Sequence, residues 1–152
     1  MAQQAQTRSA PVDEQLCFAI YAASRAMTGY DRPLLDAVGL TYPQYLVMLV
    51  LWERGEATVT GIGQALQLET GTLSPLLRRL EALGLVCRNR QIDDQRSVLM
   101  SLTPAGRALE SDIISTQKRV GEATGLSRAE SVELRNALHG LTGRLRSAAG
   151  AG

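Results

Sequence analysis

The sequence predicts a mainly helical fold with one small β-hairpin, an α+β arrangement, in a chain of 152 residues. Apolar residues recur every three to four positions over most of the chain, which is the period of an α-helix. The period changes to two over residues 85–90 and 97–102, which indicates two strands. Ser, Thr, Pro and Gly stand where the helical stretches begin and end, as capping and helix-breaking residues do.

The first predicted helix begins near Asp13, after a polar tail, residues 1–12, that we expect to be disordered. Gly29 to Pro33 should break or kink it, and Gly39 should end it. Its expected buried stripe consists of Leu16, Ile20, Ala23 and Met27. A second helix should start at Thr41-Tyr42-Pro43 and lie in the core, because residues 44–53 are apolar almost all round.

A compact series of elements follows. Residues 56–59 predict a short strand, and a short helix capped by Thr60 should run to about Gln67. After a tight turn, a second helix should run from Gly71 to Leu83. We expect this helix to bury Leu73, Leu76, Leu77, Leu80 and Leu83. The hairpin comes next, and Thr103-Pro104 should cap helices that fill residues 105–149. A capping box at Ser127 to Glu130 should divide them in two.

This order predicts a winged helix-turn-helix over residues 56–102, with the second helix entering the major groove of DNA. The polar face of that helix supplies the candidate contacts Thr72, Ser74, Pro75, Arg78 and Arg79. At the hairpin tip, Arg96 is placed to enter a minor groove, with Asp94 fixing its side chain.

The charge distribution agrees with a local patch. The chain has a net charge of +1, so its whole surface is not basic. Residues 70–96 carry a net charge of +2, whereas residues 1–69 carry −3. A solvated basic surface remains the alternative, because such local excesses are common.

Several function classes are disfavoured. Two cysteines are too few for a disulfide-stapled secreted fold. The longest apolar run, residues 45–52, is too short to span a membrane. The one histidine has no metal-ligand spacing around it. We therefore expect a cytoplasmic protein without a metal site or cofactor.

Cys17 is a candidate reactive thiol, because it lies near a helix N-terminus, where the dipole stabilises a thiolate. Tyr21 is on the same face, and all four tyrosines lie between residues 21 and 45. Phenol groups that donate to a thiolate favour its charged form. The alternative is an inert, buried cysteine, and this alternative is stronger for Cys87 in the first hairpin strand.

Residues 16–25 (LCFAIYAASR), 40–46 (LTYPQYL), 71–77 (GTLSPLL) and 93–99 (DDQRSVL) resemble the MarR family. The first two segments are similar to its organic-hydroperoxide-sensing repressors, the OhrR group, and the likeness covers residues 14–110. It implies a homodimer in which residues 13–40 and 103–149 form dimerisation helices within a single domain, residues 13–152. It also implies a palindromic double-stranded DNA operator and no catalytic turnover.

The resemblance implies roles for single residues. The peroxide-reactive cysteine falls on Cys17, and the tyrosine that reaches it from the partner subunit falls on Tyr42. A second pocket tyrosine of the family falls on Asp31, so Tyr30, one residue earlier, is its candidate replacement. The wing arginine falls on Arg96. Since no cysteine follows Cys87, the chain resembles the single-cysteine group, in which a low-molecular-weight thiol traps the thiol oxidised by an organic hydroperoxide.

Two other functions stay open at this point. One is a regulator of the same family that is released by a small phenolic ligand without redox chemistry. The other is a thiol peroxidase, which is disfavoured because no resolving cysteine is suitably placed.

Overall fold

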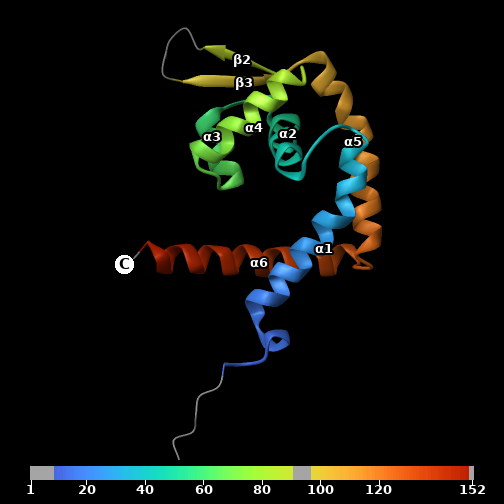
Figure 1. Cartoon of the computed structure of the whole chain (residues 1–152), viewed down its shortest axis with the longest axis vertical. Coiled ribbons are helices and arrows are strands. Elements are labelled where there is room, and N and C mark those ends of the chain that lie inside the picture. Colours follow the sequence, from blue (N-terminus) through green and yellow to red (C-terminus); the bar gives the residue numbers. More distant parts are fainter. Residues whose placement is uncertain (1–8, 91–96, 151–152) are drawn as a thin grey trace, which may run out of the picture. The chain divides into compact units, whose positions relative to one another are not determined.

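A computed structural model describes residues 9–90 and 97–150 (Figure 1). Its elements are the 3-10 turn η1 (Val12–Glu14), the helices α1 (Leu16–Asp36), α2 (Tyr42–Arg54), α3 (Val59–Leu66), α4 (Thr70–Ala82), α5 (Pro104–Ala123) and α6 (Arg128–Ala149), and the strands β1 (Glu56–Thr58), β2 (Val86–Arg90) and β3 (Val98–Leu102). The predicted helical fold with a small β-hairpin is therefore confirmed. Two compact units divide the chain, residues 1–116 and 117–152.

The helix α1 runs without interruption from Leu16 to Asp36, so of the predicted break or kink at Gly29 to Pro33, the break is wrong. Pro33 removes one backbone donor, but its carbonyl still accepts a hydrogen bond from the Ala37 amide at 3.3 Å. The helix ends at Asp36, three residues before Gly39, whose φ of +75° suits a residue without a Cβ.

The predicted buried stripe on α1 is not buried within one chain. Leu16 is 64% exposed and Met27 is 49% exposed. The buried residues of α1 are Asp31 and Leu35, both in its C-terminal half. Ala23 is exposed as well, and Ile20 is half-buried, so most of this stripe is open to solvent.

The helix α2 forms the centre of the core. Thr41 caps it through a capping box: the Gln44 amide donates to Thr41 Oγ1 at 3.4 Å, and the Thr41 amide donates to Gln44 Oε1 at 2.9 Å. Its buried side chains include Met48 and Leu51, and they pack in one core cluster with side chains from α3, α4 and the sheet, which include Ile62, Leu77, Leu80 and Met100. The predicted core position of this helix is therefore confirmed.

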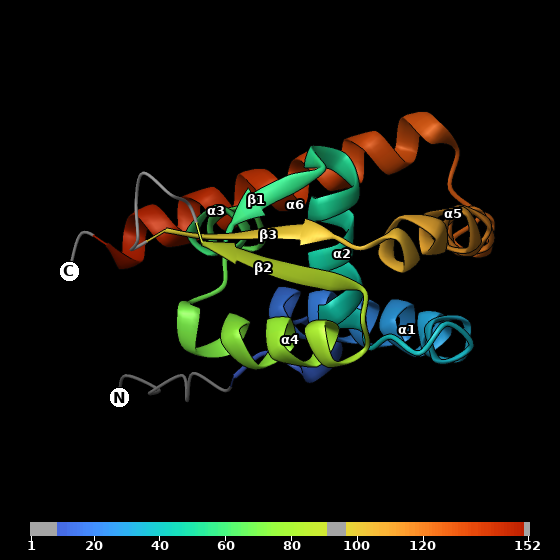
Figure 2. The same ribbon diagram turned by 90° about the horizontal axis from the view of Figure 1, so that it is seen from above.

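The three strands form one antiparallel sheet in the order β1-β3-β2 (Figure 2). Ala57 pairs with Met100, and Val86 pairs with Leu102. The predicted hairpin is confirmed, and the short predicted strand joins it through β3. The hairpin tip, residues 91–96, lies outside the described residues.

The two helices before the hairpin differ from the prediction in detail. Thr58, not Thr60, caps α3, because its Oγ1 accepts from the Gly61 amide at 3.0 Å. Three of the predicted leucines of α4 are fully buried: Leu73, Leu77 and Leu80. Leu83 is 42% exposed, because α4 has already ended and this residue is its C-cap.

Hydrogen bonds connect the start of α5 to the turn before the hairpin. As predicted, Thr103 caps the helix: its Oγ1 accepts from the Gly106 amide at 3.1 Å and donates to the Gly84 carbonyl at 2.6 Å. The indole of Trp52 donates to the Gly106 carbonyl at 2.8 Å. A Cβ at residue 106 would overlap the carbonyl oxygen of Leu85, so only glycine fits there.

The helix α6 belongs to the second unit. The predicted capping box is confirmed, with the Ser127 amide donating to the Glu130 carboxylate at 2.7 Å. These hydrogen bonds lower the pKa of Glu130. No described residue of α6 is buried, and Leu134 and Leu145 are 51% and 62% exposed. In the part of the chain that is described, no helix has the length and hydropathy to cross a bilayer.

Candidate functional site

The outward face of α4 carries the predicted nucleic-acid contacts. Because Leu73, Leu77 and Leu80 point into the core, the opposite side of the helix centres on Pro75 and Arg78. The predicted contacts Thr72, Pro75, Arg78 and Arg79 are exposed, and Ser74 is half-buried at the edge of this face. The structure therefore brings all five residues to one accessible surface.

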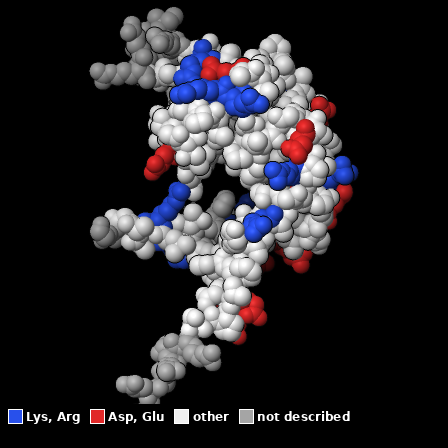
Figure 3. All heavy atoms as spheres, in the orientation of Figure 1, with Lys and Arg blue, Asp and Glu red and all other residues white. Residues whose placement is uncertain are grey.

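This face of α4 carries two cations, Arg78 and Arg79. Among the described residues, no carboxylate lies within ion-pair distance of Arg78 or Arg79. Arg88 of β2, in contrast, forms an ion pair with Glu81 of α4 at 3.4 Å, which links the hairpin to this helix. Basic side chains gather over the hairpin and α4 at the top of the view in Figure 3. Asp94 and Arg96 lie outside the described residues, so their roles stay predictions.

Cys17 lies in the first turn of α1 and is exposed, so it is not a buried core residue within one chain. Tyr21, one turn later on the same face, is 58% exposed. The guanidinium of Arg25 lies 5.6 Å from the centroid of the Tyr21 ring, a cation–π contact.

Tyr42 lies at the other end of α1, in the first turn of α2. It is 36% exposed, and its ring centroid is 5.9 Å from that of Tyr45. Burial raises the pKa of Tyr42, and the nearby charges of Asp31 and Tyr45 raise it further. Asp31 is itself only 7% exposed, and burial raises its pKa. Tyr30, the other predicted pocket residue, is 45% exposed.

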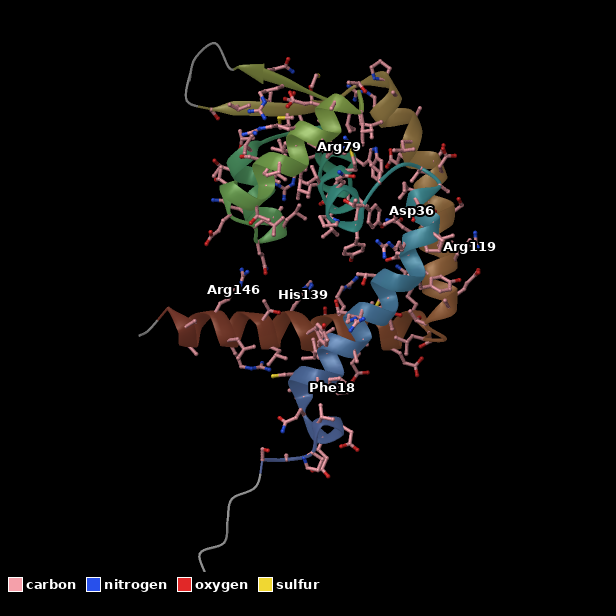
Figure 4. All side chains as sticks on the ribbon, in the orientation of Figure 1. Phe18, Asp36, Arg79, Arg119, His139 and Arg146 are labelled. Carbon is pink, nitrogen blue, oxygen red and sulfur yellow. The ribbon has the colours of Figure 1, made fainter. Side chains whose placement is uncertain are left out.

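Within one chain, Cys17 and its predicted partner Tyr42 lie at opposite ends of α1. Asp31, which lies beside Tyr42, is fourteen residues after Cys17 on the same helix. At 1.5 Å per residue this is about 20 Å along the axis. Phe18 and Asp36 mark the two ends in Figure 4. Cys17 and Tyr42 of the same chain therefore do not meet.

A cavity of about 440 Å³ lies between α1 and the start of α2. Its floor includes Leu35 and Leu40, which are both buried, and its sides include Arg25, Arg32 and the phenol of Tyr42. Sequence reasoning did not single out the two arginines as a pair. Their spacing of seven residues, two helical turns on one face, is the signal that would have found them.

Cys87 has a different setting, on β2. Its Sγ lies 3.1 Å from Ser101 Oγ on β3, and Asn89 Nδ2 donates to the same Oγ at 3.0 Å. Within the described residues, His, Cys, Asp and Glu form no group that would hold a metal ion.

Comparisons with known proteins agree with this geometry. The family described as "Transcriptional regulator SarA/Rot" matches residues 30–113. The organic hydroperoxide resistance transcriptional regulator of Bacillus subtilis is 44% identical over 82% of this chain and 82% of its own length. The structure of reduced AbfR bound to DNA has a TM-score of 0.76 and 33% identity, over 90% of this chain and 93% of that one.

A third relative is regulated by a small molecule. The structure of BpsR from Bordetella bronchiseptica, whose DNA binding is regulated by 6-hydroxynicotinic acid, has a TM-score of 0.76 and 25% identity. The match covers 85% of this chain and 99% of that one.

Proposed function

Because the chain belongs to the MarR/SarA-type family of winged-helix transcriptional regulators, we propose that it is a cytoplasmic, homodimeric repressor that senses organic hydroperoxides. Oxidation of Cys17 is the sensing event, and release of a palindromic operator is the response. The similarity to the Bacillus subtilis hydroperoxide resistance regulator supports the redox part of this proposal.

The α4 helix is the element that enters the major groove. Its Arg78 and Arg79, which have no ion-pair partner among the described residues, supply phosphate or base contacts, and its small polar residues Thr72 and Ser74 allow close approach. In a two-fold dimer, the two copies of α4 would read half-sites about 34–36 Å apart. Asp94 and Arg96 at the hairpin tip would add minor-groove contacts.

The exposed apolar residues indicate where the dimer forms. Leu16 and Phe18 on α1, and Leu134 and Leu145 on α6, are exposed although they are large and apolar. Such side chains are expected at an interface rather than in water. A two-fold interface uses the same surface of both chains, so α1 of one chain would lie near α1 of the other.

The separation of Cys17 from Tyr42 along α1 is the observation that carries the proposal. Cys17 is exposed at one end of α1, and the phenols of Tyr30 and Tyr42 lie about 20 Å away at the other end, so a site that joins them to this thiol needs a second chain. An antiparallel arrangement of two α1 helices about a two-fold axis would place Cys17 of each chain beside Tyr42 of its partner. Tyr30 lies in the same region and is the second candidate donor.

The chemistry follows from a thiolate held by phenol groups. The Cys17 thiolate attacks the distal oxygen of the hydroperoxide, the O–O bond breaks, and the alkoxide leaves as an alcohol after taking a proton. A low-molecular-weight thiol then condenses with the sulfenic acid and releases water, which leaves a mixed disulfide. Each lost hydrogen bond to the thiolate contributes about 1.5–3 kcal/mol. Nearly complete release requires a shift of ~5.5 kcal/mol between the DNA-bound and the released state. The hydrogen bonds lost at the two Cys17 sites of a dimer, together with the steric cost of the two mixed disulfides, approach this value.

A second candidate function is release by a small ligand without redox chemistry. The cavity beside Tyr42 and the similarity to BpsR favour it. The two functions differ in whether Cys17 is needed for release.

The deciding experiment is operator binding before and after one equivalent of cumene hydroperoxide, with mass spectrometry of Cys17. The expected result is release of the wild-type protein together with a mass increase at Cys17, while Cys17→Ser binds DNA and ignores the peroxide. Cys87→Ser is the matched control and should respond as the wild type does. Release of Cys17→Ser by the peroxide would refute the sensing role.

A further inference from the structure

We propose that the side-chain amide of Gln67, in the turn between α3 and α4, donates a hydrogen bond to a phosphate of bound DNA and so fixes the start of α4 on the duplex. The inference rests on the proposed function for the position of α4 in the major groove. It adds a contact from a residue that lies outside both α4 and the hairpin.

Gln67 has a backbone conformation that is usually found in glycine. Five of the described residues have a positive φ, and Gln67, at +59°, is the one among them that is not a glycine. In the left-handed region a Cβ crowds the backbone, so this conformation costs glutamine more free energy than glycine. Glycine would therefore make the turn more stable, and the presence of glutamine needs another explanation.

The end of α3 requires the left-handed conformation. The Leu68 amide donates to the Gly63 carbonyl at 2.9 Å, which is the hydrogen bond that ends a helix on a left-handed residue. Gly63 is buried, and a Cβ on it would lie 2.9 Å from the Leu68 carbonyl oxygen, so α3 and the turn are in close contact. The side chain of Gln67 therefore extends from a fixed point of the turn.

The Gln67 side chain has no polar partner within the described part of the chain. It is exposed and forms no hydrogen bond with another described residue. No such hydrogen bond therefore offsets the cost of its backbone conformation. Side-chain amides are common donors to the phosphates of DNA, so a contact with the duplex would explain why glutamine stands here.

The start of α4 favours an anion as the partner of this donor. The side chain of Glu69, the N-cap, accepts no hydrogen bond from the first-turn amides, so these amides and the positive end of the helix dipole stay available. Gly71 and Thr72 are exposed, and the space around Gly71 is open, so a DNA backbone can approach. The charge of Glu69 opposes a phosphate. The approach therefore depends on neutral donors, and Gln67 carries the only side-chain amide of this turn.

The turn also lies where the proposed DNA contacts are. Figure 1 and Figure 2 both show the turn between α3 and α4 on the same side as the C-terminal end of β2 and the N-terminal end of β3. These two strand ends lead into the hairpin tip. A duplex that receives α4 and reaches the hairpin would therefore pass beside the turn.

The test measures DNA binding and stability on one set of variants. Binding of the reduced, full-length protein to a mixed-sequence duplex of about 30 base pairs, long enough for two half-sites, is followed by fluorescence anisotropy over a salt series. The sequence of this duplex is arbitrary, because a phosphate contact carries no sequence information. Thermal unfolding of each variant gives its stability.

Two substitutions separate the side chain from the backbone. Gln67→Gly removes the donor and relieves the left-handed conformation, so it should unfold at a higher temperature than the wild type. It should also bind about tenfold more weakly or worse, which is the effect of losing a hydrogen bond to a charged group. Gln67→Met keeps the length of the side chain and removes only the donor, so it should bind as weakly as Gln67→Gly without the gain in stability. Wild-type affinity in both variants, or weaker binding in Gln67→Gly alone, would overturn the proposal, because the latter result indicates a loosened turn.

A third substitution tests whether the partner is a phosphate. Gln67→Lys keeps a donor and adds a charge, so it should bind at least as tightly as the wild type. The slope of log affinity against log salt should steepen by about one for each copy of α4. An unchanged slope would exclude a phosphate at this place. Gln64→Met, which removes an exposed amide one turn earlier on α3, is the matched control and should bind as the wild type does. An equal loss of affinity in this control would also count against the contact.

This contact and the proposed function fail in distinguishable ways. If the wild type binds no duplex at any salt concentration, both are wrong. If the wild type binds, and Arg79→Ala weakens binding while no substitution of Gln67 does, α4 still enters the groove and only the contact of Gln67 is wrong.

Discussion

Asp31 on α1 and Tyr42 on α2 form an electrostatically linked pair. Burial raises the pKa of the Tyr42 phenol, and the negative charge of the Asp31 carboxylate raises it further. Asp31 is itself buried, and burial raises its pKa. A phenol whose pKa is raised stays protonated over a wider range of pH. Such a phenol can donate to a thiolate, which is the role that we propose for Tyr42.

Asp31→Asn should lower the pKa of Tyr42, because the carboxylate charge that opposes the tyrosinate is removed. Part of the shift should remain, since burial and Tyr45 still oppose ionisation. Alkaline titration of tyrosinate absorbance, with Tyr42→Phe as the subtraction control, measures the change. Asp36→Asn, an exposed carboxyl on the same helix, should leave the titration of Tyr42 where it is.

The same substitution should change the pH dependence of stability. A carboxyl whose pKa is raised by folding favours the native state at low pH, and this contribution is lost as pH rises through the native pKa. At neutral pH, Asp31→Asn should therefore increase the free energy of unfolding. The difference from the wild type should shrink below a pH of about 4, where the carboxyl is protonated in both states. Urea unfolding at several pH values measures it, and a gap that grows as pH falls would contradict the assignment.

Tyr42→Phe should slow oxidation of Cys17 by about ten- to a hundredfold, because a hydrogen bond to a charged group is worth about 1.5–3 kcal/mol. The rate of sulfenic acid formation with cumene hydroperoxide measures the effect at neutral pH. Tyr30→Phe, tested beside it, shows whether Tyr30 shares this role. A rate unchanged by Tyr42→Phe would remove that phenol from the thiol site.

Local rules predicted most of the boundaries of the helices and strands. The capping residues Thr41, Thr103 and Ser127 and the change of period at the hairpin depend on near neighbours in the sequence, so the pattern reports them directly. The cap of α3 was misplaced because Thr58 and Thr60 are both suitable capping residues two positions apart.

Long-range relations were not predictable in the same way. Nothing near Asp31 in the sequence shows that it lies beside Tyr42, because the turn between α1 and α2 creates that proximity. The exposed stripe on α1 has the same origin. A periodic apolar pattern predicts that Leu16 and Met27 are covered, but it does not tell whether the cover comes from the same chain or from a second one.

Arg79→Ala should weaken binding to all DNA sequences about equally, because a phosphate contact carries no sequence information. The slope of log affinity against log salt should fall by about one for each copy of α4, or about two per dimer. Fluorescence anisotropy with operator and scrambled duplexes over a salt series measures both quantities. Arg54→Ala is the charge-matched control, and an unchanged salt slope for Arg79→Ala would exclude a phosphate contact there.

Gly106→Ala should destabilise the winged region, because a Cβ at this position would overlap the carbonyl oxygen of Leu85. That carbonyl accepts a hydrogen bond from the Thr103 amide at 3.1 Å. If the carbonyl moves to make room for the Cβ, this hydrogen bond between the start of α5 and the residue before β2 is lost. Overpacking of this kind costs about 1–3 kcal/mol, and more where backbone must shift.

Gly121→Ala, in the same helix with open space around the position, is the matched control and should stabilise slightly. Thermal unfolding of both variants, followed through the fluorescence of Trp52, tests the pair, because the Trp52 indole donates to the Gly106 carbonyl. Equal unfolding midpoints would show that α5 does not need this close approach.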